Sequence, residues 1–329
     1  MSPADKKMGN PDHIGGAHNP EEFHPDGGMG TTPVAVIDSE ASSRTLLRDA
    51  IRRLRRNKLA IAAIIWIGIM VAVALSADLW VARVLGDPIK IDTTKVVAQS
   101  LQTPTLAHPF GRDDLGRDIL ARVIYGARIS LAVGVIATAI SVLVGLIMGA
   151  LAAYYGGLLD SFVMRLTDVF LAFPYILFAI ALIAVLGRGF VNIFIAIGLL
   201  GWPTIARVFR SSILQVKENE YVDAARALGA GDVRIMARHI MPNAVAPIIV
   251  YATMSIGGAI LTEAAMSFLG VGILQPTPAW GLMLSDARGY IYNAPHLMIF
   301  PGLAILTTVL AFVLLGDGLR DALDVKMKD

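Results

Sequence analysis

The chain has 329 residues, of which 55% are hydrophobic and only 16% are charged. Soluble domains carry about 25% charged residues, so the composition excludes an ordinary water-soluble globular protein and indicates one bundle of membrane spans. The net charge of +2 is too small to indicate nucleic-acid binding. The absence of cysteine excludes disulfides, thiolate catalysis and cysteine-ligated metals.

Residues 1–43 are rich in Gly, Pro, Asp, Glu and His and show no periodicity. Such a segment buries too little apolar surface to offset the entropy of ordering, so we expect a disordered tail. His13, His18 and His24 suggest a metal site as an alternative, but a polar tail with scattered histidines is the favoured interpretation.

Residues 44–58 combine seven Lys and Arg residues with apolar residues at helical spacing, directly before an apolar run. This pattern predicts a basic amphipathic helix on the cytoplasmic membrane face. DNA binding is the weaker alternative, because the basic run abuts a span.

Six apolar stretches meet or approach the roughly 20 residues that a spanning helix needs. The expected fold class is therefore an all-α membrane protein with six transmembrane helices. The stretches are 59–75 with continuation to 85, 129–153, 169–186, 190–208, 245–261 with continuation to 269, and 297–315. The resulting organisation has an extracytoplasmic loop at 86–128, a five-helix core at 129–316 and a cytoplasmic tail at 317–329.

The distribution of Lys and Arg predicts the orientation. With both termini in the cytoplasm, the inside segments hold 17 Lys and Arg and the outside segments hold 9. Positive charge is retained inside, so we expect both termini to be cytoplasmic. Seven of the nine outside residues lie in the long first loop, where the charge rule is weak.

Small residues recur in the spans, and Gly145-Leu-Ile-Met-Gly149 fits the spacing that lets helices approach closely. We interpret it as packing within this chain, with contact to a second membrane subunit as the alternative.

The segment His108–Leu131 mixes acids with Arg117, Arg122 and Arg128, and a helix is expected to begin near Asp118. We predict local ion pairs at the rim of the bundle. A metal site at His108, Asp113 and Asp114 is the alternative, although the spacing matches no common site.

A second polar segment, residues 207–242, separates two spans. A helix is predicted over Glu218–Leu228, ended by Gly229, which tolerates the left-handed conformation. Asp232 is the expected N-cap of a second helix over 233–240, and Pro242 marks the turn to the next span. Connections in helix bundles are normally about 2–8 residues long, so the excess length favours a docking role over a simple connector.

Here the sequence resembles a known family. Asp223-Ala-Ala-Arg-Ala-Leu-Gly229 with Met241-Pro242 resembles the "EAA" coupling motif of ABC importer permeases, with Asp223 in the place of the usual Glu. His108–Leu131, Leu261–Gly272 and Gln275–Gly281 are similar to the C-type permease of dipeptide, oligopeptide and nickel importers. The resemblance covers about residues 45–325.

The resemblance implies a type I importer fold with six helices in a bacterial plasma membrane, and uptake of dipeptides or oligopeptides. The implied partners are a second, B-type permease, one or two ABC ATPase subunits and an extracytoplasmic binding protein. The chain lacks the G-x-x-x-x-G-K-[ST] phosphate loop, so ATP and Mg²⁺ are expected on the ATPase partners and no catalytic residue is expected here. The implied ATPase-coupling residues are Tyr221, Asp223, Ala224, Ala225, Leu228, Gly229 and Pro242.

Glu263 is an ionisable residue within a predicted span, which makes it a candidate for the substrate pathway, together with Met266. The alternatives for Glu263 are a packing role or a pair with Arg288. Asp168 is expected to pair locally with Arg165.

Three other functions stay open at this stage. The same permease could carry nickel or another small solute. An ion-coupled secondary transporter or channel would be expected to show inverted repeats, and we find none that is convincing. An intramembrane enzyme would need a nucleophile and base, or a His and Asp cluster, within the spans; no His lies within a predicted span core, so this class is disfavoured.

Overall fold

The structure is a computed structural model that describes residues 51–85, 87–91 and 96–323. The predicted disordered tail and the first part of the predicted basic helix, up to residue 50, lie outside the described residues, as do residues 324–329. Of the basic helix, residues 51–54 are helical and are followed by a turn.

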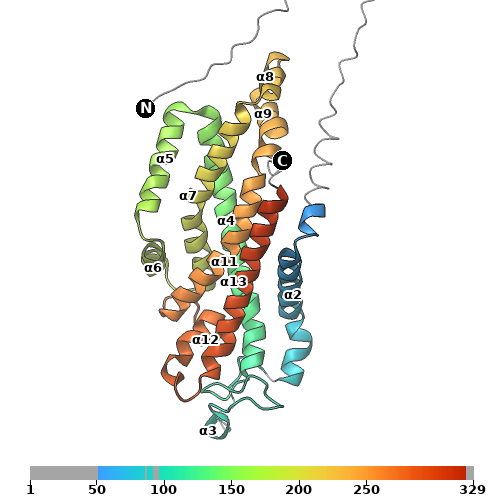
Figure 1. The fold of residues 1–329 in the computed structure, drawn as a ribbon. Coiled ribbons are helices and arrows are strands. Elements are labelled where there is room, and N and C mark those ends of the chain that lie inside the picture. The colour runs from blue at the N-terminus through green and yellow to red at the C-terminus, as the bar shows by residue number, and fades with distance from the viewer. Residues whose placement is uncertain (1–50, 86, 92–95, 324–329) are drawn as a thin grey trace, which may run out of the picture. The chain divides into compact units, whose positions relative to one another are not determined.

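The described residues are almost entirely helical, and none of them forms a strand (Figure 1). The short helices are the single turn at 51–54, α3 (Val96–Gln99), α12 (Trp280–Asp286) and a 3₁₀ helix (Ala287–Tyr290). Further short helices lie between α7 and α11. The long helices are α2 (Lys58–Val84), α4 (Ile119–Tyr155), α5 (Gly157–Ala172), α6 (Tyr175–Leu186), α7 (Phe190–Lys217), α11 (Ala246–Phe268) and α13 (His296–Leu323).

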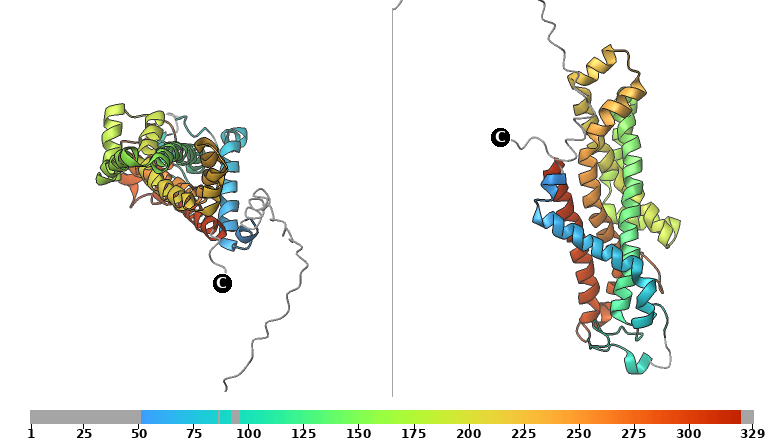
Figure 2. Two further views of the ribbon diagram at one scale, coloured as in Figure 1. Left: turned by 90° about the horizontal axis from the view of Figure 1, so that it is seen from above. Right: turned by 90° about the vertical axis from the view of Figure 1, so that its right-hand side faces the viewer.

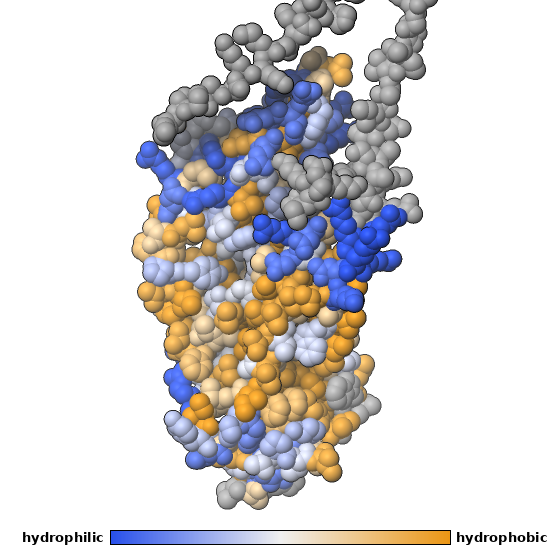
Figure 3. Space-filling model, viewed as in Figure 1, coloured by the Kyte–Doolittle hydropathy of each residue, from blue (hydrophilic) through white to orange (hydrophobic). Residues whose placement is uncertain are grey.

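Within the described part of the chain, five helices are long and apolar enough to cross a membrane: α2, α4, α7, α11 and α13. Helices α5 and α6 pass the same test only as a pair, and they meet at an angle of 93°. The all-α membrane fold is therefore confirmed, with five spans among the described residues, or six if the bent pair crosses the membrane as one span. Figure 3 shows apolar residues across the middle of one face, with hydrophilic residues gathered towards both ends.

The spanning helix predicted over 169–186 is not continuous, because the chain breaks at Phe173–Pro174. Proline has no N–H to donate and disfavours the helical conformation of the residue before it. Phe173 accordingly has an extended backbone, with φ −89° and ψ 139°.

Three helices continue beyond their apolar runs. Helix α4 begins at Ile119 with Asp118 as its N-cap, which confirms the helix start expected there but places residues 119–128 of the predicted loop inside a helix. Helix α7 runs to Lys217 and α13 to Leu323. The predicted coupling loop and C-terminal tail therefore begin as helix, because charged residues end an apolar run without breaking the backbone hydrogen bonds.

The most extensive helix contact joins α4 and α7. A Cβ atom placed on Gly145 would lie 2.6 Å from Ile205 Cγ2, and one placed on Gly149 would lie 2.6 Å from the Ala206 carbonyl oxygen. The interpretation of these glycines as packing residues within this chain is confirmed, since both are buried against α7.

Helix α2 lies at one side of the bundle, beside α13 and α4 (Figure 2). Polar contacts fasten it to α4. The Arg128 guanidinium donates to the carbonyl oxygens of Ala74 and Leu75 and, at 2.8 Å, to Asp78 Oδ2. The Tyr125 hydroxyl donates to the other Asp78 oxygen at 2.9 Å.

The α4–α7 contact predicts a large difference between two similar substitutions. Gly149→Ala forces a methyl group against the backbone of α7, and overpacking of this kind costs about 1–3 kcal/mol. Gly68→Ala, also within a helix, meets nothing within 4 Å and should leave stability unchanged or slightly raised. Thermal unfolding in detergent should show a lowered midpoint for Gly149→Ala alone. Equal midpoints would contradict the close approach of the two helices.

Candidate functional site

The segment between α7 and α11, residues 218–245, forms a helical hairpin that projects from one end of the bundle (Figure 1). It contains α8 (Glu220–Ala227), α9 (Asp232–Ile235), a π-helix (Met236–Ile240) and α10 (Met241–Ala244). The helix predicted over Glu218–Leu228 is confirmed, with slightly shorter bounds.

Helix α8 is held to the bundle by one buried side chain. Val222 is fully buried and packs in a cluster with Ile213, Ile235 and Ile240. The other side chains of α8 are exposed or half-buried, including Tyr221 at 43% and, just after the helix, Leu228 at 89%. Val222 was not singled out from the sequence, although it is the one β-branched apolar residue in this polar helix.

Gly229 ends α8 with φ +81°, as predicted. Two backbone bonds close the turn: Gly229 N–H donates to the Arg226 carbonyl at 3.0 Å, and Ala230 N–H donates to the Ala225 carbonyl at 3.1 Å. This pair of bonds is the Schellman arrangement, which requires a left-handed residue at the position of Gly229. Asp223 and Arg226, three residues apart on α8, form an ion pair at 3.2 Å.

The second arm of the hairpin differs from the prediction in detail. The N-cap position falls on Gly231, and Asp232 is the first helical residue. The helix widens to a π-turn over 236–240 and continues into α10, with Pro242 in the first turn of α10. The wide turn comes directly before Pro242, whose ring would clash with a carbonyl of a regular helix.

A side-chain contact ties the two arms together. The Asn243 amide donates to the His239 carbonyl at 2.7 Å and to the Tyr221 hydroxyl at 3.2 Å. Burial raises the pKa of Tyr221, although its hydrogen bonds oppose the shift. Tyr221 is therefore a neutral link between α8 and α10, and part of its ring stays exposed.

Polar contacts connect the base of the hairpin to α4 and α5. Lys217 Nζ donates to the Tyr154 carbonyl at 3.2 Å. The Arg210 guanidinium binds both oxygens of Asp160 at 2.5 Å, and Arg207 pairs with Asp168 at 2.5 Å. The predicted local pair of Asp168 with Arg165 is wrong, because the facing α7 brings Arg207 within reach.

The two residues proposed for a substrate pathway, Glu263 and Met266, are buried in the helix bundle. Glu263 is fully buried. Its carboxylate accepts one hydrogen bond from the Ser267 hydroxyl at 2.7 Å and one from the Ser130 hydroxyl at 3.4 Å. Met266 is fully buried as well. Arg288 does not pair with Glu263; it donates to the Phe268 carbonyl at 2.6 Å. In this conformation neither side chain reaches a surface, which favours a packing role.

The charged residues at the opposite end of the bundle pair with one another, as predicted. Asp113 pairs with Arg117 at 2.7 Å, and Arg122 lies 3.5 Å from Asp113 and 3.8 Å from Asp286. His108 binds Asp118 at 2.7 Å. Burial raises the pKa of Asp286, and burial together with Asp113 raises that of Asp114. Within the described ranges no group of His, Asp and Glu has the arrangement of a metal site.

The charged cluster of Asp113, Arg117, Arg122 and Asp286 connects two parts of the chain, because Asp286 ends α12 and the other three residues lie in or just before the start of α4. Arg117 and Arg122 are almost fully buried, so neighbouring carboxylates, and not water, stabilise their positive charges. Buried ion pairs therefore hold this end of the bundle together, in contrast to the exposed hairpin at the other end.

Comparison with known proteins agrees with this arrangement. Residues 141–329 match the family described as binding-protein-dependent transport system inner membrane component, and residues 45–104 match the N-terminal TM domain of oligopeptide transport permease C. The dipeptide transport system permease protein DppC of Alkalihalophilus pseudofirmus is 45% identical over 85% of this chain and 90% of its own length.

Two further relatives are named for glutathione transport. The permease GsiD of Escherichia coli is 46% identical over 87% of this chain and 92% of its own length, and GsiD of Pectobacterium atrosepticum is 42% identical over 91% and 97%. A chain of the MetNI methionine ABC transporter in an inward-facing conformation shares the fold, with a TM-score of 0.52 at 20% identity over 62% of this chain and 97% of that chain.

Proteins of this family are multi-pass subunits of the inner membrane that work in a complex with ATPase subunits, a permease partner and a substrate-binding protein. The chain belongs to the binding-protein-dependent transport system inner membrane components.

Proposed function

We propose that this chain is the C-type permease subunit of an ABC importer that takes up dipeptides or oligopeptides. The observation that carries the proposal is the exposed α8 hairpin, which holds the Asp223–Gly229 motif at the end of α7. The relatives named for dipeptide and glutathione transport support a peptide substrate, since glutathione is a tripeptide. A nickel complex is the second candidate.

The hairpin is the proposed docking site for an ATPase subunit. Ala224 and Ala225 are small enough to let another protein approach closely, and Tyr221 and Leu228 offer apolar area to a groove. ATP and Mg²⁺ bind to the ATPase subunits, of which there are one or two kinds, and a B-type permease completes the membrane part. The binding protein delivers the peptide from the other side.

Movement of the hairpin is passed on through α7. The buried side chain of Val222 packs against α7 and couples α8 to the end of that helix. Lys217 contacts α4, and Arg207 and Arg210 pair with α5, so a displacement of α7 is transmitted to α4 and α5. Helix α5 ends at the bend before Pro174, so a shift of α7 changes the angle between α5 and α6. That change is the proposed switch between inward and outward access.

In the proposed orientation the hairpin and both termini are cytoplasmic. The excess of Lys and Arg in the segments that this orientation places inside, 17 against 9 outside, supports it. Arg52, Arg55 and Arg56 lie on the described stretch before α2, and all three side chains are exposed.

Substitution of Gly229 tests the docking role. A Cβ atom placed on Gly229 meets nothing within 4 Å of its own chain, but in Gly229→Val the left-handed conformation costs a non-glycine residue about 1–2 kcal/mol. We expect the reconstituted complex to assemble and to lose substrate-stimulated ATP hydrolysis. Gly231→Ala is the matched control, because Gly231 has φ −69°. Unchanged stimulation in Gly229→Val would contradict the role.

Cysteine labelling tests the orientation in this otherwise cysteine-free chain. Ser100→Cys should react with a membrane-impermeant thiol reagent added outside the cell. Val233→Cys, in the hairpin and 83% exposed, should react only after the membrane is opened. The reverse pattern would overturn the topology.

Two substitutions separate packing from substrate contact at Glu263. Glu263→Gln keeps a hydrogen-bonding group for Ser267 and should leave peptide uptake and selectivity unchanged. Glu263→Leu leaves buried hydroxyls unpaired, at about 1–3 kcal/mol, and should lower the thermal unfolding midpoint. A change of selectivity in Glu263→Gln would place Glu263 in the pathway instead.

A further inference from the structure

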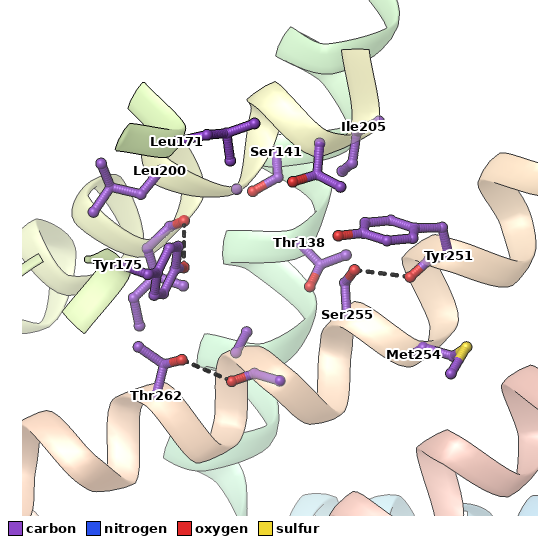
Figure 4. A pocket seen from close by; sticks show the side chains of 15 residues that line it. Thr138, Ser141, Leu171, Tyr175, Leu200, Ile205, Tyr251, Met254, Ser255 and Thr262 are labelled. Carbon is purple, nitrogen blue, oxygen red and sulfur yellow. Dashed lines mark hydrogen bonds between the residues drawn. The ribbon is translucent and has the colours of Figure 1, made fainter. Parts of the chain in front are cut away.

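Helix α11 borders two hollows of opposite chemistry. A cavity of about 370 Å³ lies between α4, α7, α11 and the bend that joins α5 to α6. Hydroxyl groups line part of it, among them those of Thr138, Ser141 and Thr262 (Figure 4). An apolar groove of about 470 Å³ lies between α11 and α13 and reaches α12, and every residue that lines it is apolar. The hydroxyl-lined cavity and the apolar groove share no lining residue, so they are separate hollows.

The apolar groove is narrow. Helices α11 and α13 lie side by side, with α12 packed against both (Figure 1). Leu306 at the edge of the groove is 60% exposed, whereas Ala264 and Ile305 at its floor are only 5% and 7% exposed. An α-helix with its side chains is about 10–12 Å across, so a hollow with so sheltered a floor admits one extended hydrocarbon chain and not a helix.

A cation lies at the end of the apolar groove that α12 borders. The Arg288 Cζ atom lies 4.2 Å from the centre of the Phe268 ring, and its guanidinium donates to the Phe268 carbonyl at 2.6 Å. Phe268 lines the groove, and so does Leu284, four residues before Arg288. Helix α11 is long and apolar enough to cross a membrane and ends at Phe268. Arg288 therefore lies where the apolar span ends, at the level of the lipid headgroups.

The charge of Arg288 is available to a ligand. Its side chain is exposed, and no carboxylate among the described residues forms an ion pair with it. Asp286, two residues earlier, lies 3.8 Å from Arg122 and accepts a hydrogen bond from Gln275 at 3.0 Å. A guanidinium has five N–H donors, and the bond to Phe268 uses one of them. The remaining donors can bind a phosphate group, which matches the fork of an arginine.

An apolar groove with a cation at its headgroup end fits a phospholipid of net negative charge. The groove alone selects no particular lipid, because all lipid tails are as apolar as leucine. Selection must therefore come from the headgroup, and an arginine at the membrane surface attracts anionic lipids. A free phosphate ion would contact Arg288 but leave the groove unfilled.

We propose that the apolar groove between α11 and α13 is a binding site for one anionic phospholipid. An acyl chain lies along Ala264 and Ile305, and the phosphate binds to Arg288. In the proposed orientation of the chain this lipid belongs to the outer leaflet. It contacts α11, α12 and α13 together, and its binding does not depend on which solute the complex transports.

The test counts the lipids that the complete complex keeps after detergent extraction from bilayers of equal parts phosphatidylglycerol and phosphatidylcholine. Mass spectrometry of the intact complex counts each lipid. Gly302→Leu fills the groove from α13, where a Cβ atom would lie 4.0 Å from its nearest neighbour, Leu284 Cδ2. This variant should keep one lipid fewer than the unsubstituted complex. Gly68→Leu is the matched control, because Gly68 also lies in a helix and a Cβ atom there meets nothing within 4 Å; its lipid count should not change.

Two results of this count would overturn the site. One is an equal number of lipids in the unsubstituted complex and in Gly302→Leu. The other is loss of the second permease subunit from Gly302→Leu without loss of a lipid, which would make the groove a contact between subunits.

Arg288→Gln tests the headgroup contact. The readout is the ratio of phosphatidylglycerol to phosphatidylcholine among the lipids that disappear when Gly302→Leu is added, so lipids bound elsewhere cancel. Arg288→Gln should lower this ratio roughly fivefold, the effect of one cation at the membrane surface, and Arg288→Lys should keep it. Arg188→Gln is the matched control, since Arg188 is also exposed but does not line the groove. An unchanged ratio in Arg288→Gln, or an equal fall in Arg188→Gln, would overturn the proposal.

Discussion

The close contact between α4 and α7 is the constraint on which the rest of the structure depends. Gly145 and Gly149 on α4 leave no room for a side chain against Ile205 and Ala206, and Gly198 on α7 lies equally close to Ile140. Without a hydrophobic driving force between helices in lipid, packing at small residues is what holds spans together. This contact fixes α7, and α7 carries both the hairpin and one wall of the cavity.

From this contact two regions of the structure follow. At one end, α7 continues towards α8 and is tied to α5 by Arg207 and Arg210. In the middle, its residues 197–205 face α11 across the hydroxyl-lined cavity. One helix therefore joins the exposed hairpin at one end of the bundle to one wall of this cavity. At the far end of the bundle, Arg122 lies within ion-pairing distance of Asp113 and Asp286.

Local features of the fold were predictable from sequence, and features that join distant segments were not. The apolar runs, the cap at Asp118 and the left-handed Gly229 each depend on neighbouring residues. Pro174 was a visible signal for the break at Phe173, but the apolar run around it hid the break. The partner of Asp168 is 39 residues away, so a nearby Arg165 was the wrong choice. The burial of Glu263 and the cavity at Thr138 arise only when four helices meet.

The central claim is that the exposed end of α8 contacts an ATPase subunit. The most direct measurement places a photo-crosslinking amino acid at Leu228, which is 89% exposed, and illuminates the purified complex. The account predicts a covalent product between this chain and an ATPase subunit. The same amino acid at Tyr292, 95% exposed at the other end of the bundle, should give no such product. A crosslink to the ATPase from Tyr292 and none from Leu228 would contradict the account.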